Sequence, residues 1–174
     1  MENILFYIGQ GLGAIAVILG FINYQTKTRK QLLVVHIATT LCFSLHYLCL
    51  GGWAGMVMNA VGIVRNLVFY YTDKKKISNR YAAIFFAIIM GILGITTSLI
   101  AKEGIYFVLS IVGLVINSYA MSFSNPNNIR KSILITSPMV LIYDAFILSI
   151  GGMIYESVVI ISSIIGIIRY KNFK

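Results

Sequence analysis

Three polar side chains interrupt an apolar segment, MNAVGIVRNLVFYY, that begins at Met58. They are Asn59, Arg65 and Asn66. Amide and charged groups are costly in hydrocarbon, so inside a membrane span they pack against another helix or line a solvated cavity. An amide both donates and accepts hydrogen bonds and carries no charge, which suits a neutral, hydroxyl-rich solute. The chemistry that these residues indicate is solute recognition.

Small and polar residues recur at 3-4-3-4 spacing on four apolar segments, and this spacing places each set on one helix face. The sets are Gln10, Gly13, Val17, Gly20 and Tyr24; Gly52, Gly55, Asn59, Gly62 and Asn66; Ser110, Gly113, Asn117, Ala120 and Ser124; and Gly152, Tyr155, Val159, Ser162 and Gly166. Such faces allow close helix packing or line a cavity. Because the amides concentrate near mid-membrane, we predict that Asn59, Asn66 and Asn117 contact a solute.

Arg65 flanks this face and does not lie at its centre. It precedes Asp73 by eight residues, which corresponds to about 12 Å of helix. Its side chain either reaches the inner headgroups, or lies at the cavity edge, where it contacts solute or closes the inner gate. We take the second interpretation as the prediction, and we expect Trp53 to contact solute near the outer mouth of the cavity.

Three further ionisable residues, His46, Asp144 and Glu156, are expected in the outer halves of their segments. His46 and Asp144 precede two glycine pairs by five and seven residues, so a contact between them is one hypothesis. A pair of this kind would couple transport to protons or act as a gate, whereas the alternatives are a structural ion pair or the lining of a vestibule. His36, near the start of its segment, is expected at the membrane interface.

The segments that position these residues are long enough to cross a bilayer, for which about 20 apolar residues suffice. Breaks in the apolar pattern give spans near 4–24, 32–50, 53–72, 81–101, 104–122, 132–150 and 152–168. The chain is 59% hydrophobic and only 11% charged, which is more apolar than a soluble domain requires. Residues 1–174 are therefore predicted to form a single all-α integral membrane domain with seven transmembrane helices in the lipid bilayer.

Lysine and arginine gather at alternate ends of these spans. If the first, third, fifth and seventh spans end in the cytoplasm, that side holds 12 of the 14 basic residues, with Lys102 outside and Arg65 within the membrane. Because positive residues mark cytoplasmic loops, we predict a multi-pass protein with its N-terminus outside and its C-terminus inside.

A shift of 100 residues aligns features of the two halves of the chain. Gly13 meets Gly113, Gln25 meets Asn125, Lys30 meets Arg130, and the glycine pair 51–52 meets the pair 151–152. Residues 4–72 and 104–170 are thus predicted to be two three-helix repeats, with 81–101 as an uncharged linker helix. Four crossings separate the starts of the repeats, so the predicted 3+1+3 repeat is parallel, with its axis along the membrane normal.

Other classes of protein find little support in the sequence. The net charge is +9, but the basic residues flank apolar runs, as membrane-flanking charge does and nucleic-acid contacts do not. Cys42 and Cys49 lie seven residues apart on one segment, too far apart for a disulfide. The sequence indicates no metal, cofactor or enzyme, because it lacks Cys/His clusters and GxSxG, HExxH, Walker A and GxGxxG motifs. Residues 4–24 are read as a retained helix, since no basic region precedes them.

The predicted layout resembles that of the SWEET and SemiSWEET sugar facilitators and their PQ-loop relatives. Asn59 and Gly62 are similar to the Asn-x-x-Gly that lines the solute site on their third helix, whereas Val159 stands where a second site asparagine would lie. The stretch NYQTKTRK resembles the PQ-loop region, with Tyr24 in place of the proline. Over nearly its whole length the chain resembles the YgjV family of bacterial inner-membrane proteins, through YQTKTRKQL, LHYLCLGGWAGMVMN and VRNLVFYY.

These resemblances imply a transporter of the bacterial inner membrane that moves a small polar solute by alternating access, as facilitated diffusion. Sugars, nucleosides and vitamin precursors all stay open as solute classes, because the nicotinamide-riboside transporters share a related plan. The alternative is a non-transporting membrane scaffold or sensor whose polar helix faces only pack. A homo-oligomer is compatible with either function.

Overall fold

The computed structural model is helical at every segment predicted to cross the membrane. It describes residues 2–49, 53–75, 77–100, 102, 107–146 and 150–170. The helices are α1 (Glu2–Gln25), α2 (Arg29–Cys49), α3 (Trp53–Lys74), α4 (Arg80–Ile100), α5 (Phe107–Ala120), α6 (Pro126–Phe146) and α7 (Ile150–Arg169). No strand occurs among these described residues, so the predicted all-α class is confirmed.

Four helices are long and apolar enough to cross a membrane. Their qualifying stretches are Ile4–Gln25, Arg29–Cys49, Arg80–Ile100 and Gly151–Arg169. Val108–Ala120 of α5 is apolar but shorter in the described part of the chain. The presence of membrane-spanning helices is thus confirmed, and the full count of seven spans stays a prediction.

Two helices, α2 and α6, begin three or more residues before the apolar spans that the sequence predicts, because side chains cap their first turns. At the start of α2, the Thr28 backbone N–H donates to Gln31 Oε1 at 3.2 Å, and the Gln31 N–H donates to Thr28 Oγ1 at 3.3 Å, which is a capping box. At the start of α6, Asn125 Oδ1 accepts from the Asn127 N–H at 2.9 Å. Pro126, the first residue of α6, needs no backbone N–H there. The helices therefore extend past the apolar runs into polar sequence.

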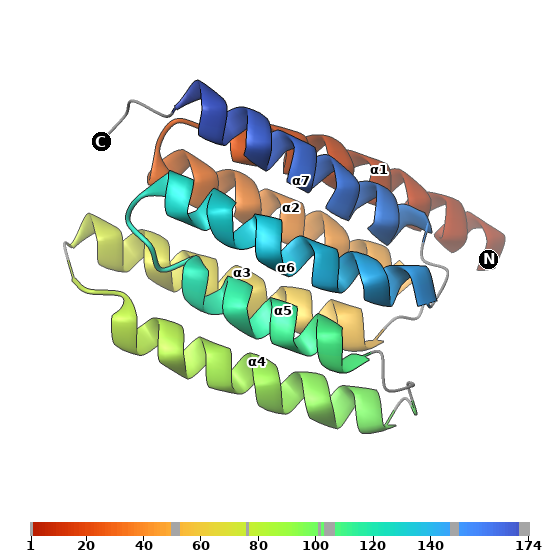
Figure 1. The fold of residues 1–174 in the computed structure, drawn as a ribbon. Helices are drawn as coiled ribbons and strands as arrows, with labels where there is room; N and C mark the ends of the chain where they lie inside the picture. Colours follow the sequence, from red (N-terminus) through yellow and green to blue (C-terminus); the bar gives the residue numbers. More distant parts are fainter. Residues whose placement is uncertain are drawn as a thin grey trace.

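The helices close into a ring. Each helix packs against the next along the chain, and α7 packs against α1. Figure 1 shows α1, α2 and α3 in one layer and α7, α6 and α5 in the other, with α4 at the edge beside α3 and α5. Since no helix fills the centre, the side chains that point inward from the ring can enclose a cavity.

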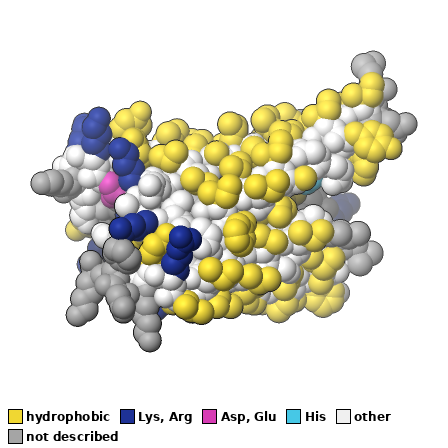
Figure 2. Space-filling view, turned by 90° about the horizontal axis from the view of Figure 1, so that it is seen from above, with side chains coloured by type: hydrophobic (Ala, Val, Ile, Leu, Met, Phe, Trp, Pro, Cys, Tyr) yellow, Lys and Arg dark blue, Asp and Glu magenta, His cyan; other side chains and the backbone are white. Residues whose placement is uncertain are grey.

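The outside of the ring is apolar along its length. Exposed residues on its flank include Ile18 at 62%, Ile92 at 58% and Ile168 at 69%. In Figure 2 apolar side chains cover this flank, and lysine and arginine gather mainly at one end. We name this the basic end; α1, α3, α5 and α7 end there, and α2, α4 and α6 begin there. An apolar flank with charge at the end is the surface that a bilayer requires.

The basic end is closed by buried apolar side chains. One cluster joins the described residues Leu32, Leu33, Phe69, Ala83, Phe86, Met121 and Ile129. All seven lie near the ends of their helices on this side. A second cluster joins Tyr24, Ile133 and Val159. Together these clusters separate the interior of the ring from the basic end.

Two buried arginines connect helices from the two halves of the chain at this end. Arg130 of α6 donates from Nε to the Tyr24 carbonyl of α1 at 2.8 Å and from Nη2 to the Thr26 carbonyl. Arg29 of α2 donates to the Phe123 carbonyl after α5 and forms a salt bridge with Asp73 of α3 at 2.5 Å. These carbonyls lie at helix ends, where the helix supplies no partner. The arginines therefore satisfy carbonyls of the opposite half of the chain, and we call them the arginine clamps.

Candidate functional site

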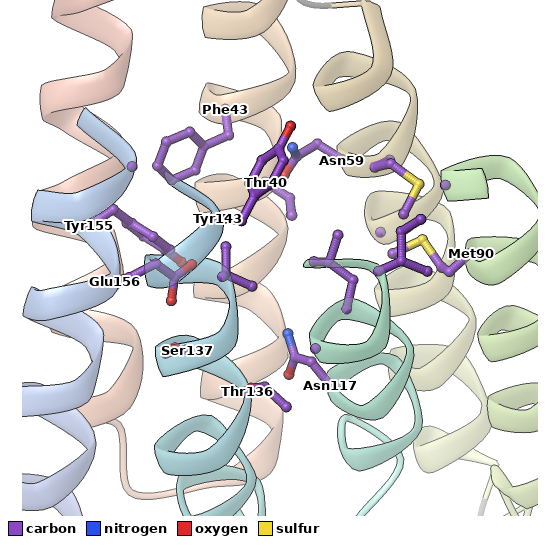
Figure 3. Close-up of a pocket in the computed structure, with 18 of the residues that line it drawn as sticks. Thr40, Phe43, Asn59, Met90, Asn117, Thr136, Ser137, Tyr143, Tyr155 and Glu156 are labelled. Atoms are coloured by element: carbon purple, nitrogen blue, oxygen red, sulfur yellow. The ribbon is translucent and has the colours of Figure 1, made fainter. Parts of the chain in front are cut away.

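A central cavity of about 750 Å³ lies inside the ring, and described residues from all seven helices line it. This volume is within the range of small-molecule binding sites, roughly 300 to 1,000 Å³. Figure 3 shows Asn59 and Tyr143 towards one end of the pocket, and Asn117 and Thr136 towards the other. The cavity is bounded on the side of the basic end by Tyr24, Ile133 and Val159.

Two of the asparagines predicted to contact solute face this cavity. Asn59 lines it from α3 and Asn117 lines it from α5. The Asn117 side-chain oxygen is buried and has no hydrogen-bond partner among the described residues. A buried amide oxygen without a partner has lost its hydration without compensation, so a donor on a bound molecule would stabilise this position.

Asn66 lies behind the cavity wall and supports Arg65. It is fully buried and is not among the described residues that line the cavity. Its Oδ1 accepts from Arg65 Nε and Nη2, both at 3.2 Å, and its Nδ2 lies 3.2 Å from His36 Nδ1. Because a guanidinium only donates, the amide oxygen must face Arg65 and the amide nitrogen must donate to His36. Asn66 therefore orients the Arg65 guanidinium from the side that faces away from the cavity.

Arg65 is only 2% exposed and lines the cavity. The structure therefore places its side chain at the cavity and not at the headgroups. His36 was expected at the membrane interface, but it is 6% exposed and lines the same cavity. The difference arises because α2 begins at Arg29, which puts His36 two turns inside the helix.

The structure does not bring together the histidine and aspartate considered as a pair. His46 Nδ1 lies 2.7 Å from the Gly9 carbonyl of α1, and Gly13 leaves room for its ring, since a Cβ there would lie 3.0 Å from Nδ1. Asp144 lines the cavity from α6, while His46 is not among the described lining residues. His46 therefore fixes α2 against α1, and of the three candidates only Asp144 and Glu156 are left to line the cavity.

Glu156 lines the cavity from α7, next to Tyr155. Its carboxylate accepts a hydrogen bond from the Ser137 hydroxyl of α6. Trp53 was predicted to contact solute near the outer mouth. Its backbone lies in α3, and its side chain is outside what the structure describes. The predicted site is thus divided between cavity-lining residues (Asn59, Arg65, Asn117, Asp144 and Glu156) and residues behind the wall (His46 and Asn66).

Apart from Asp144, which the sequence had marked as a candidate, sequence reasoning missed the contributions of α2 and α6 to the cavity. From α2 come His36, Thr40, Phe43 and Tyr47, and from α6 come Ile133, Ser137, Val140 and Asp144. Both sets have 4-3-4 spacing, which is the spacing of one helix face. The spacing that identified a face on four other segments was therefore also present on α2 and α6. On these two helices, however, the face combines aromatic, hydroxyl and apolar residues and lacks the glycines that marked the other four.

A ring of helices with an apolar flank, a basic end and a central cavity that several polar side chains line defines a multi-pass α-helical membrane protein. The model of the Imp-YgjV family, described as bacterial inner membrane protein, matches residues 7–174. The chain belongs to this family, and the sequence-based resemblance to it is confirmed. No curated protein and no solved structure matches the chain significantly.

Proposed function

We propose that this inner-membrane protein is a transporter of a small polar solute that works by alternating access. The observation that carries the proposal is the central cavity, because all seven helices line it. A face used only for helix packing buries its amides between two helices. Here Asn59 and Asn117, from helices on opposite layers, face a common space.

The two halves of the chain would move as parallel three-helix repeats, with α4 as the linker. The position of α4 between α3 and α5 at the edge of the ring supports this. The arginine clamps support it too, since α2 holds the end of α5 while α6 holds the end of α1. A shift of 100 residues exchanges α1 with α5 and α2 with α6, as a twofold relation requires.

Alternating access requires each end of the cavity to open in turn. Buried apolar clusters and the arginine clamps close the basic end in this structure. The distribution of lysine and arginine supports a cytoplasmic location for this end. The conformation would then be closed towards the cytoplasm.

Cysteine labelling tests this orientation. In a variant without Cys42 and Cys49, a cysteine at position 75 should react with an impermeant maleimide only from the cytoplasmic side of the membrane. A cysteine at position 151 should react only from outside. Both positions are exposed at helix ends, so the reagent can reach them. Labelling of position 75 from outside would overturn the orientation and the proposed parallel repeat with it.

Uptake into proteoliposomes tests the transport function itself. The purified full-length protein is reconstituted and supplied with radiolabelled sugars, nucleosides, vitamin precursors and organic cations such as choline. We expect saturable uptake of at least one solute above that of protein-free liposomes. Folded protein that neither takes up nor binds any member of the panel would contradict the transporter and favour the scaffold or sensor.

A further inference from the structure

The far half of the cavity, away from the basic end, contains a group of aromatic rings that face the space from two helices. Phe43 of α2 and Tyr155 of α7 lie with ring centroids 4.6 Å apart at an interplanar angle of 81°. Tyr47, one turn after Phe43, stacks on it at 6.1 Å. All three line the cavity. The faces of aromatic rings carry partial negative charge.

Two carboxylates lie beside these rings. Glu156 adjoins Tyr155 on α7, and Figure 3 shows its side chain next to that ring. Asp144 lines the same cavity, and its carboxylate lies against Gly152, where an added Cβ would come within 2.7 Å of Oδ1. The two carboxylates are close enough to interact electrostatically with each other and with Tyr47. Three aromatic rings and two carboxylates thus place negative charge around one volume.

Among the described residues, no lysine or arginine forms a salt bridge with either carboxylate. Asp144 is 5% exposed, and its carboxylate lies against Gly152 at the start of α7. The salt bridge found in the described part of the chain joins Arg29 and Asp73 at the basic end. Arg65, the cation of the cavity wall, is directed to Asn66. A buried carboxylate without a cationic partner either takes up a proton or binds a cation, so a cationic group in this half of the cavity would stabilise the ionised carboxylates.

The chemistry of the wall favours an organic cation. A hard inorganic cation requires six or more oxygen ligands, and aromatic faces supply none. A neutral hydroxylated solute could donate hydrogen bonds to the two carboxylates, but it would leave their charge uncompensated. A quaternary ammonium or pyridinium group, in contrast, is attracted by aromatic faces and carboxylates together, because it combines an apolar surface with a positive charge.

We propose that this half of the cavity is a subsite for the cationic group of an organic solute, formed by Phe43, Tyr155, Asp144 and Glu156. The proposal rests on the proposed transport function, because it names the class of solute that the transport cavity takes. The remaining part of such a solute would face Asn59, Asn117 and Arg65, which suits hydroxyl or acidic groups at its other end.

Binding measurements on the purified full-length protein test this subsite. The probes are tetramethylammonium, choline and N-methylpyridinium chlorides, exchanged for sodium chloride at constant ionic strength. The control is 3,3-dimethylbutan-1-ol, which has the shape of choline without its charge. We expect at least one cation to raise the melting temperature saturably and to bind in calorimetry, whereas the neutral alcohol and sodium do not.

Variants then assign the binding to these residues. Glu156→Gln keeps the shape of the side chain and Phe43→Leu keeps its apolar character, and each should weaken cation binding by about tenfold or more. Phe86→Leu is the matched control, because Phe86 forms an edge-to-face pair with Phe69 at 6.2 Å in the apolar cluster and is not a described lining residue. It should lower the melting temperature but leave the cation affinity unchanged.

Several results would overturn the subsite. The first is that none of the three cations binds to the folded protein. The second is that the neutral alcohol binds as well as choline, or that sodium chloride raises the melting temperature as much as the cations do. The third is that Glu156→Gln binds the cations with unchanged affinity. Uptake separates this proposal from the transporter. Saturable uptake of a neutral solute without cation binding would support the transport function and contradict the cation subsite. Cation binding without any uptake would support the subsite and contradict the transport function.

Discussion

Replacement of Asn59 by leucine is expected to abolish solute uptake in proteoliposomes while the protein remains folded and inserted. Asn59 lines the cavity from α3, and leucine removes both its donor and its acceptor. Hydrogen bonds inside membrane proteins are worth only about 0.6 kcal/mol on average, so the loss of one amide should cost little stability. A solute that exchanges its hydration shell for this amide has no substitute in the variant.

The matched control is the same substitution at Asn23. Asn23 is fully buried in α1, is not among the described lining residues, and has no hydrogen-bond partner for its side-chain amide within the described chain. Asn23→Leu should keep uptake and should not lower the melting temperature, because an unsatisfied amide is replaced by an apolar group. If Asn59→Leu instead loses stability but keeps its uptake per folded molecule, Asn59 serves packing and the cavity is not the solute site.

Replacement of Gly166 by alanine is expected to lower the free energy of unfolding by about 3 kcal/mol, through overpacking and a broken buried hydrogen bond. A Cβ at this position of α7 would lie 2.6 Å from Arg130 Nε and would also clash with the Tyr24 carbonyl. These two groups are the partners of one arginine clamp, at 2.8 Å. The methyl group cannot fit unless the clamp opens.

Alanine at Gly151 is the control on the same helix. No atom lies within 4 Å of the corresponding Cβ position, so Gly151→Ala should be neutral or slightly stabilising through helix propensity. Chemical denaturation in detergent, with both variants in parallel, gives the comparison. Equal stability of the two variants would show that the contact between α7 and the clamp contributes nothing.

The helices were predictable because lipid imposes a simple rule on sequence: about 20 apolar residues, flanked by charge. The spans expected near 53–72 and 81–101 lie within two residues of α3 and α4. The span expected near 132–150 differs from α6 by six residues at its start, because Asn125 and Pro126 begin the helix in polar sequence. Hydropathy detects contact with lipid, and it does not detect a cap.

The site was predictable only where one helix face carried the whole signal. Asn59 and Asn117 could be assigned to a cavity because their glycine-rich faces are visible in the sequence. The separation of Asn66 from the cavity could not be foreseen, because it depends on His36 from another helix. The same is true of Asp144, whose surroundings come from residues distant in sequence. Which polar residues face one another is decided by packing between helices, and a periodic pattern on one helix contains no information on its neighbours.

In the proposed alternating-access cycle, the arginine clamps would also determine how the molecule distributes between conformations. Opening the basic end requires Arg130 to release the Tyr24 and Thr26 carbonyls and Arg29 to release the Phe123 carbonyl, since each joins opposite halves of the chain. A hydrogen bond to a charged group contributes about 1.5 to 3 kcal/mol. Three such bonds total about 4.5 kcal/mol or more, which would leave the open form below about 0.1% of molecules. In the proposed cycle the resting population would then be closed at the basic end, and a solute would drive opening only as far as it binds the open form more tightly than the closed one.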